Sequence, residues 1–274
     1  MVVSTQAITS AFKSPALTAY KRSYQKRGQR DVLHEEVFRS LSNVVQSPIN
    51  RVLYPGCHRH ITASLVFPDV DYVDFDRKVS DVYNDDAVKD WVLSETSNDQ
   101  TDESSVQHKW TFTCASYESM AQKKTKFKNN SYDLMISLSA GIVSTPCARY
   151  IRPGGYFLVN DAHADASAAF VATTDNKGSK MFNLVAAWEE GMGWKTTDLE
   201  DYFKTTKRDF ISAKQAHEAA EIGSKSKRSF RLMKDAHFYL FRKSSSTRGG
   251  KSVGETEEGV EAKSQSSNKR RRVK

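Results

Sequence analysis

The sequence predicts an α/β fold, in which a mostly parallel sheet carries helices on both faces. Short apolar segments alternate with segments of helical period, and turns containing glycine or proline separate several of them. Short apolar strands of this kind are typical of parallel sheets that helices cover on both sides. No apolar run reaches the roughly 20 residues that span a bilayer, so no membrane partner is expected. A chain of 274 residues is long enough to bury one sizeable core.

The expected elements follow one another along the chain. The first helix has apolar side chains at helical spacing after an Asp that can cap it. Helices are expected at residues 31–45, 61–67, 77–92 and 142–151. Strands are expected at residues 51–54, 71–73, 110–114, 134–138, 156–160, 182–188 and 237–241. The polar stretch 94–108 is expected to form a surface loop between a helix and a strand.

Basic charge is concentrated at the two ends of the chain. Of the net charge of +8, residues 1–30 contribute +6 and residues 244–274 contribute +4, which leaves −2 for residues 31–243. We therefore expect one nearly neutral domain at 31–243 between two disordered extensions, since the last segment is too polar to pack. Net charge gives no reason to expect a basic face on that domain, although it does not exclude a nucleic-acid partner.

The two ends point to different compartments. The run from Lys269 to Lys274 contains five basic residues and is of the type that nuclear import receptors bind. Residues 1–30 are basic, free of acid and rich in Ser and Thr, as organellar transit segments are. Three cysteines are too few for a disulfide framework, which favours a reducing compartment. We expect a nuclear protein, with the cytoplasm or an organelle as the alternative.

Two residues near strand ends favour a nucleoside-type ligand. In sheets of this class, ligands bind beyond the carboxyl ends of the strands. The first strand leads into Gly56, where a backbone without a side chain can approach a ligand closely. Asp74 ends the second strand, 18 residues later, where a carboxylate is placed to accept hydrogen bonds from a ribose. Alone, Asp74 is also explained as a helix cap, but the pair favours a nucleoside.

These residues resemble the class I S-adenosylmethionine (SAM)-dependent methyltransferases, which have a Rossmann-like fold. Tyr54-Pro55-Gly56 followed by Asp74 is similar to the first two motifs of that family. Residues 132–138 look like its fourth strand, and residues 152–159 look like its fifth strand with the preceding turn. The resemblance covers about residues 31–243. It implies a doubly wound sheet of seven strands with one late antiparallel strand, SAM as cofactor and an unknown methyl acceptor.

The resemblance also implies which residues bind the cofactor, and the chain departs from the family at some of them. The implied residues are Tyr54, Gly56, Asp74, Ser116 and Ser139. The family usually has an acid at the position of Tyr54, and glycines at the positions of His58 and His60. Side chains at the two glycine positions crowd the methionine part of SAM unless the turn takes another path. Ser116 stands where the family often has an Asp, and its hydroxyl can still form a hydrogen bond.

A candidate catalytic residue follows the fifth strand. The VLYPG turn and the segment Val159-Asn160-Asp161 followed by His163 look like a little-characterised subgroup of methyltransferase-like proteins. His163, with Asp161 near it, can act as a general base on an O–H or N–H group of a substrate. The alternative is a polar loop between a strand and a helix, with Asp161 as the cap.

Two further alternatives remain open. Cys57, Cys114 and His163 are zinc-ligand types near the same sheet edge, but no CxxC or HxxxH pair is present, so no metal is expected. The lost glycines and the charged ends favour a second function class. The sequence therefore predicts a SAM-dependent methyltransferase, with a catalytically inactive interaction protein of the same fold as the alternative.

Overall fold

The computed structural model describes residues 14–25, 30–98, 108–122, 126–174, 178–223 and 225–245. Residues 1–13 and 246–274 lie outside the described residues, and so does the basic cluster from Lys269 to Lys274. The predicted domain boundaries near residues 30 and 243 and the expected disorder of the last segment stay predictions.

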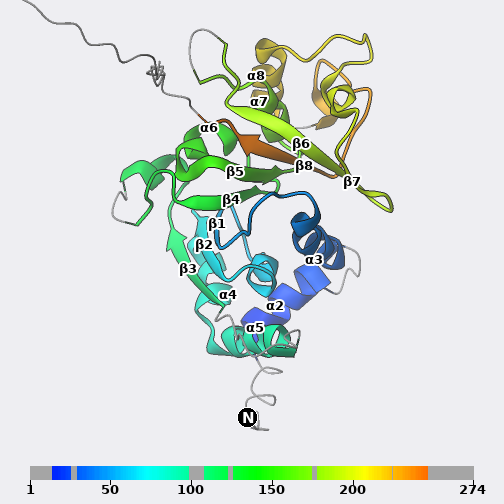
Figure 1. Cartoon of the computed structure of the whole chain (residues 1–274). Coiled ribbons are helices and arrows are strands. Elements are labelled where there is room, and N and C mark those ends of the chain that lie inside the picture. The colour runs from blue at the N-terminus through cyan, green and yellow to red at the C-terminus, as the bar shows by residue number, and fades with distance from the viewer. Residues whose placement is uncertain are drawn as a thin grey trace, which may run out of the picture.

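One mixed sheet of eight strands runs through the described residues (Figure 1). In chain order the strands are β1 (Arg51–Pro55), β2 (Asp69–Asp74), β3 (Lys109–Cys114), β4 (Tyr132–Ser137), β5 (Ile151–Val159), β6 (Phe182–Glu189), β7 (Gly193–Lys195) and β8 (Phe238–Lys243). Their order across the sheet is β3-β2-β1-β4-β5-β8-β6-β7. The pairs among β1 to β5 are parallel, whereas β8 lies antiparallel between β5 and β6. This confirms the predicted fold class.

The strand count is eight rather than seven among the described residues. The additional strand, β7, pairs antiparallel with β6 from Ala187↔Lys195 to Glu189↔Gly193. Only three residues long, β7 is too short to give a recognisable alternating pattern in the sequence.

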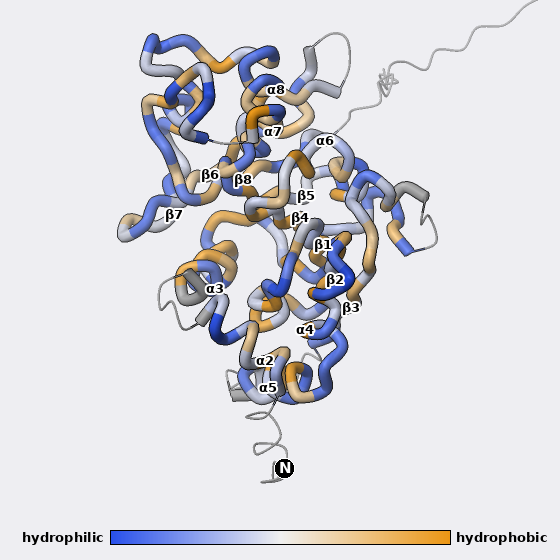
Figure 2. The backbone as a smooth tube through the Cα atoms, turned by 180° about the vertical axis from the view of Figure 1, so that it is seen from behind, coloured by the Kyte–Doolittle hydropathy of each residue, from blue (hydrophilic) through white to orange (hydrophobic). Residues whose placement is uncertain are grey.

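Helices cover both faces of the sheet (Figures 1 and 2). On one face lie α2 (Pro15–Tyr20), α3 (Arg30–Ser40), α4 (Ser80–Asn84) and α5 (Asp86–Asn98), and on the other lie α6 (Ser144–Cys147), α7 (Asp165–Val171) and α8 (Ala213–Ile222). Successive strand residues point to opposite faces. Val52 and Tyr54 accordingly belong to the core under α2 to α5, and Leu53 to the core under α6 to α8.

All four predicted helices are shorter or interrupted. Residues 31–45 form α3 and the 3-10 helix η2 (Leu41–Asn43), and residues 142–151 form α6 and the 3-10 helix η6 (Ala148–Tyr150). Residues 61–67 form the 3-10 helix η3 (Ile61–Leu65). Residues 77–92 are divided at Asp85, whose carboxylate accepts the backbone N–H of Ala87 (2.8 Å) and begins a new helix. Residues 94–98, predicted as part of a loop, continue α5. Residues 99–107 lie outside the described part.

The stretch 14–25 is ordered, contrary to the disorder expected for residues 1–30. Ser14 caps α2 by accepting the backbone N–H of Leu17 (3.0 Å), and its hydroxyl donates to Asp85 (2.8 Å). Leu17 and Tyr20 are buried against the sheet domain, and the hydroxyls of Tyr20 and Thr62 lie 2.9 Å apart. The composition of this segment shows only that it is basic. Its packing depends on residues far along the chain, such as Thr62 and Asp85, and so could not be predicted from composition.

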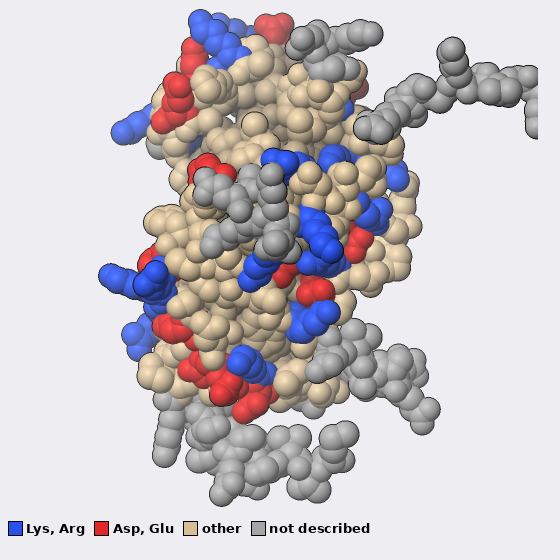
Figure 3. Space-filling model, turned by 90° about the vertical axis from the view of Figure 1, so that its left-hand side faces the viewer, with Lys and Arg blue, Asp and Glu red and all other residues tan. Residues whose placement is uncertain are grey.

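Charges of both signs are interspersed on the surface. Figure 3 shows Lys and Arg side chains sharing one face with Asp and Glu. Ion pairs join Arg51 to Asp71 (3.0 Å) and Arg152 to Asp133 (2.6 Å). Among the described residues, no helix is both long enough and apolar enough to cross a membrane.

Gly56 ends β1 in a tight turn that no other residue type fits. Its φ is +64°, in the left-handed region, and its N–H donates to the carbonyl of Val73 on β2 (2.7 Å). A Cβ at this position would lie 2.3 Å from the Cβ of Ala140, which follows β4. The turn after β1 and the loop after β4 are therefore in direct contact.

We expect Gly56→Ala to lower the free energy of unfolding by more than Gly191→Ala, its matched control. Gly191 also has a positive φ (+76°), but a Cβ there would meet nothing within 4 Å. Gly191→Ala should thus show the cost of the backbone conformation alone, about 1 kcal/mol, and Gly56→Ala roughly 2 kcal/mol more from overpacking. Urea unfolding measures both. Equal losses would contradict the contact between Gly56 and Ala140.

Candidate functional site

Two neighbouring cavities lie at the carboxyl ends of the central strands. The chain runs from β1 outward to β2 and β3 and then returns to β4 on the other side of β1, which makes this edge a topological switch point. The first cavity has a volume of about 410 Å³ and the second about 310 Å³. Gly56, His58 and Ser139 line both, so the two cavities meet at the turn after β1.

Asp74 lies at the end of β2 in the first cavity. One of its carboxylate oxygens accepts the N–H of His58 (2.8 Å) and the other accepts the N–H of Asp76 (2.9 Å). A carboxylate has about four lone-pair sites, so each oxygen can accept a further hydrogen bond. The side chain is almost completely buried at 7% exposure, which fixes its orientation. Asp74 thus holds the turn and also offers acceptors to a ligand.

Apolar and hydroxyl-bearing side chains form a further part of the wall of the first cavity. Phe75, directly after Asp74, is 76% exposed at the cavity edge. Ser116 follows β3 and accepts the N–H of Ser119 (3.2 Å), so its own hydroxyl proton remains available. Burial, with the nearby carboxylates of Glu118 and Asp165, raises the pKa of Tyr117 to about 12, so its phenol stays protonated.

The three residues that depart from the methyltransferase pattern, Tyr54, His58 and His60, each form a hydrogen bond to a neighbouring ring. The hydroxyl of Tyr54 lies 2.8 Å from Nδ1 of His60, and both side chains are buried. His58 has a φ of +46°, so its backbone adopts the left-handed conformation expected of a glycine at that position. The His58 ring turns to the hydroxyl of Tyr24, 3.0 Å away. The turn therefore keeps a glycine-like path while carrying imidazoles.

Ser139 links the tips of β4 and β5. Its φ is +60°, its N–H donates to Oδ1 of Asn160 (3.0 Å), and Nδ2 of Asn160 donates to its hydroxyl oxygen (3.1 Å). The hydroxyl proton of Ser139 and the second amide proton of Asn160 remain available to a ligand. Both residues line the second cavity.

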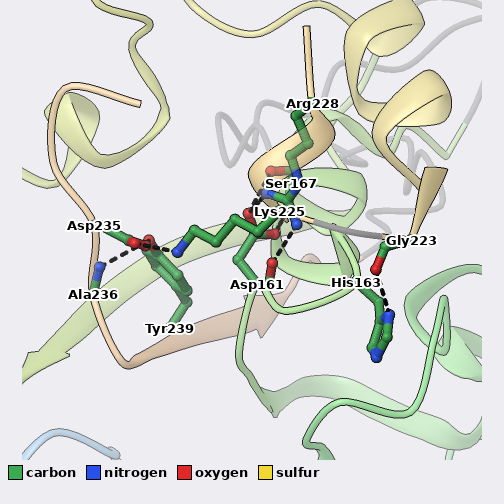
Figure 4. Close-up of polar contacts among 9 residues, drawn as sticks. All are labelled: Asp161, His163, Ser167, Gly223, Lys225, Arg228, Asp235, Ala236 and Tyr239. Atoms are coloured by element: carbon green, nitrogen blue, oxygen red, sulfur yellow. Dashed lines mark hydrogen bonds and ion pairs between the residues drawn. The ribbon is translucent and has the colours of Figure 1, made fainter. Parts of the chain in front are cut away.

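His163 lines the first cavity, in the loop between β5 and α7. Its Nδ1 lies 2.9 Å from the carbonyl oxygen of Gly223, at the carboxyl end of α8 (Figure 4). A carbonyl only accepts, so Nδ1 carries the proton and Nε2 presents a lone pair. In this tautomer Nε2 can act as a general base.

Asp161 lines neither cavity and anchors the same loop from behind. Its carboxylate accepts the N–H (2.8 Å) and the hydroxyl (3.1 Å) of Ser167 in α7. Arg228 donates to the same carboxylate (2.5 Å) and to the Asp161 carbonyl (Figure 4). The two charged side chains are 2% and 0% exposed. The carboxylate of Asp161 thus accepts a backbone N–H in the first turn of α7, and its catalytic role stays a prediction.

Asp165 is a second buried carboxylate under this edge. It accepts hydrogen bonds from the hydroxyl of Ser137 (2.8 Å) and the N–H of Ser144 (2.9 Å). Burial raises its pKa to about 6 despite these bonds. It ties β4, α6 and α7 together below the first cavity.

The structure brings together most of the residues implied by the sequence. Gly56, Asp74, Ser116, Ser139 and His163 line the first cavity, and Tyr54 lines the second. Sequence reasoning missed Phe75, whose position directly after the strand-end acid is a usable signal. It also missed Tyr24 and Arg228, which no sequence spacing connects to the site. Among the described residues, no three His, Cys, Asp or Glu side chains are grouped as metal ligands.

Comparisons with known proteins give fold-level similarity alone. No protein family and no curated protein matches the sequence. The O-methyltransferase TomG from Streptomyces achromogenes, solved in complex with SAM, is 10% identical over 85% of this chain and 91% of its own, with a TM-score of 0.43. A putative O-methyltransferase from Klebsiella pneumoniae is 11% identical over 88% and 96%, with a TM-score of 0.42. The YcgJ protein from Bacillus subtilis is 17% identical, with a TM-score of 0.32, and the match spans about half of each chain (46% and 50%).

Because these TM-scores are below 0.5, the fold assignment depends on the strand order and strand directions of this chain. Five parallel strands with the order 3-2-1-4-5, followed by an antiparallel strand between the fifth and sixth, agree with the expected arrangement. The described residues thus form a doubly wound, Rossmann-like α/β fold with a late antiparallel strand, as the sequence predicts.

Proposed function

We propose that the protein binds SAM at the edge formed by β1, β2 and β4 and transfers its methyl group to an acceptor. The observation that carries the proposal is the placement of Asp74, buried at the end of β2 with acceptor sites toward a cavity of about 410 Å³. That volume lies in the range of small-molecule sites.

The residues of the first cavity fit the nucleoside part of SAM. Asp74 would accept the ribose hydroxyls, Phe75 would pack on the face of the adenine, and Ser116 would bond its edge. The amino-acid part would lie at Gly56 and Ser139, on the side of the first cavity, where His58 also forms part of the wall. SAM, when bound, supplies an electrophilic methyl group.

The chain itself would contribute alignment and one proton acceptor. His163 lines the same cavity as Asp74, and Gly223 fixes its Nδ1–H tautomer. Its Nε2 would accept the proton that an O–H or N–H acceptor loses as the methyl group arrives. Most of the rate gain would come from holding the acceptor atom in line with the methyl group.

We predict that Asp74→Asn weakens binding of S-adenosylhomocysteine, the demethylated product, by ten- to a hundredfold. The loss corresponds to about 1.5–3 kcal/mol for hydrogen bonds to a charged acceptor. Calorimetric titration measures the dissociation constants. Asp76→Asn is the control. Asp76 lines the same cavity, but its carboxylate accepts the backbone N–H of Lys78 (2.9 Å), so the change should leave the affinity nearly unchanged.

Two outcomes would count against the proposal. Wild-type protein that binds neither SAM nor S-adenosylhomocysteine would favour the catalytically inactive interaction protein. Equal binding by wild type and Asp74→Asn would place the nucleoside elsewhere.

We predict that Arg228→Met lowers the free energy of unfolding by about 3–5 kcal/mol, since it leaves the Asp161 carboxylate buried without its cation. Adding Asp161→Asn should recover part of the loss, because an amide oxygen still accepts the N–H of Ser167. Lys225→Met removes the exposed pair with Asp235 and should cost about 1 kcal/mol or less. Urea unfolding measures these losses. NMR signals of the His163 imidazole nitrogens report whether the loop keeps its conformation in each variant. A full loss in the double variant, or a small loss in Arg228→Met, would show that the pair does not anchor the loop.

A further inference from the structure

The second cavity has walls made largely of aromatic and imidazole rings. They come from the segment η1 (Lys21–Gln25), from α3, from β1 and the turn after it, and from the start of β8 with the residue before it: Tyr24, His34, Tyr54, His58, His60, His237 and Phe238. We propose that this cavity binds an uncharged planar aromatic molecule of one or two rings. On the proposed function, that molecule is the methyl acceptor.

The rings of the wall pack against one another, and their remaining faces and edges line the cavity. The His60 ring lies 4.7 Å from Tyr24 and 4.7 Å from His34, measured between ring centroids. The His34 ring in turn lies 5.5 Å from Phe238, at 70° to it. These are ordinary separations for tilted and edge-to-face ring pairs. A planar ring added to the cavity would therefore find faces and edges in several orientations.

The charge of the walls selects against an ionic ligand. None of the described residues that line the cavity is an Asp, Glu, Lys or Arg. An ion moved into such surroundings loses its hydration without gaining a counter-ion. Aromatic cages also bind quaternary ammonium groups, but here four of the seven rings are imidazoles, and no carboxylate of the described residues lines the cavity to balance a cation. The walls thus favour a neutral ring over a cation or an anion.

The polar groups of the cavity lie at its junction with the first cavity. Ser139 has a hydroxyl proton to donate, Asn160 has a second amide proton, and Ser139 also lines the first cavity. A hydroxyl or ring nitrogen of the ligand would bind there, while its rings pack against the sides of His60, Tyr24 and His34 that line the cavity. The hydroxyl or nitrogen that accepts the methyl group would then face the first cavity, which His163 lines.

The size of the cavity limits the ligand. A volume of about 310 Å³ is at the lower end of the range for small-molecule sites, which suits one ring or two fused rings. Leu33, from α3, lines this cavity but not the first one. A larger side chain at Leu33 therefore fills the second cavity and leaves the first unchanged.

The test titrates the full chain with 2-naphthol, followed by ligand-observed NMR. We expect binding with a dissociation constant of about 0.1–1 mM, in keeping with the affinity that a molecule of this size reaches. Leu33→Trp should weaken this binding at least about tenfold, while binding of 5′-methylthioadenosine, a nucleoside without the amino-acid part, stays as in wild type. Leu93→Trp, at a surface position of α5 with 42% exposure, is the matched control and should bind both probes normally.

Three results would overturn the inference: no 2-naphthol binding to wild type, unchanged binding to Leu33→Trp, or equally tight binding of 2-naphthoate or of benzyltrimethylammonium. The two proposals fail separately. Suppose that wild type binds 2-naphthol, that Leu33→Trp weakens that binding, and that wild type binds no SAM, S-adenosylhomocysteine or 5′-methylthioadenosine. That result would support the aromatic site and contradict the proposed methyltransferase activity.

Discussion

The hydrogen bond from the backbone N–H of His58 to Asp74 joins the two strands on which the site depends. It holds the turn after β1 against the end of β2, and Gly56 adds a second bond to the carbonyl of Val73. The same turn packs against Ala140 in the loop after β4. Three neighbouring strands of the switch point are thus fixed by one short segment. Because the Asp74 carboxylate is oriented by backbone amides, it would meet a ligand without reorganising.

The residues that differ from the methyltransferase pattern in the turn after β1 are joined by hydrogen bonds and ring contacts, directly or through Tyr24, so we interpret them as one coupled change. Where the methyltransferase pattern has an acid and two glycines, this chain has Tyr54, His58 and His60. Tyr54 and His60 share a buried hydrogen bond, and His58 accepts the left-handed backbone while its ring contacts Tyr24. The space near the junction is consequently lined by rings. This gives the edge a second cavity of distinct chemistry beside the one that holds Asp74.

Much of the fold could be predicted from sequence, because buried parallel strands are short, apolar and bounded by turns. Asp74 and Gly56 could be found since their separation follows from the length of one strand–helix–strand unit. Arg228 could not be found, because its partner Asp161 lies 67 residues away and no local pattern connects them. Charge composition also gave the wrong expectation for residues 14–25, whose order depends on Leu17 and Tyr20 packing against distant elements.

The central claim is that a nucleoside binds at Asp74, between the turn after β1 and the end of β3. Amide chemical shifts of the full chain, recorded by NMR during titration with S-adenosylhomocysteine, test it directly. The account predicts the largest shifts at the amides of His58 and Asp76, which donate to Asp74, and at Ala115 and Ser116 beside them. Shifts confined to another part of the molecule, or none at saturating ligand, would contradict it.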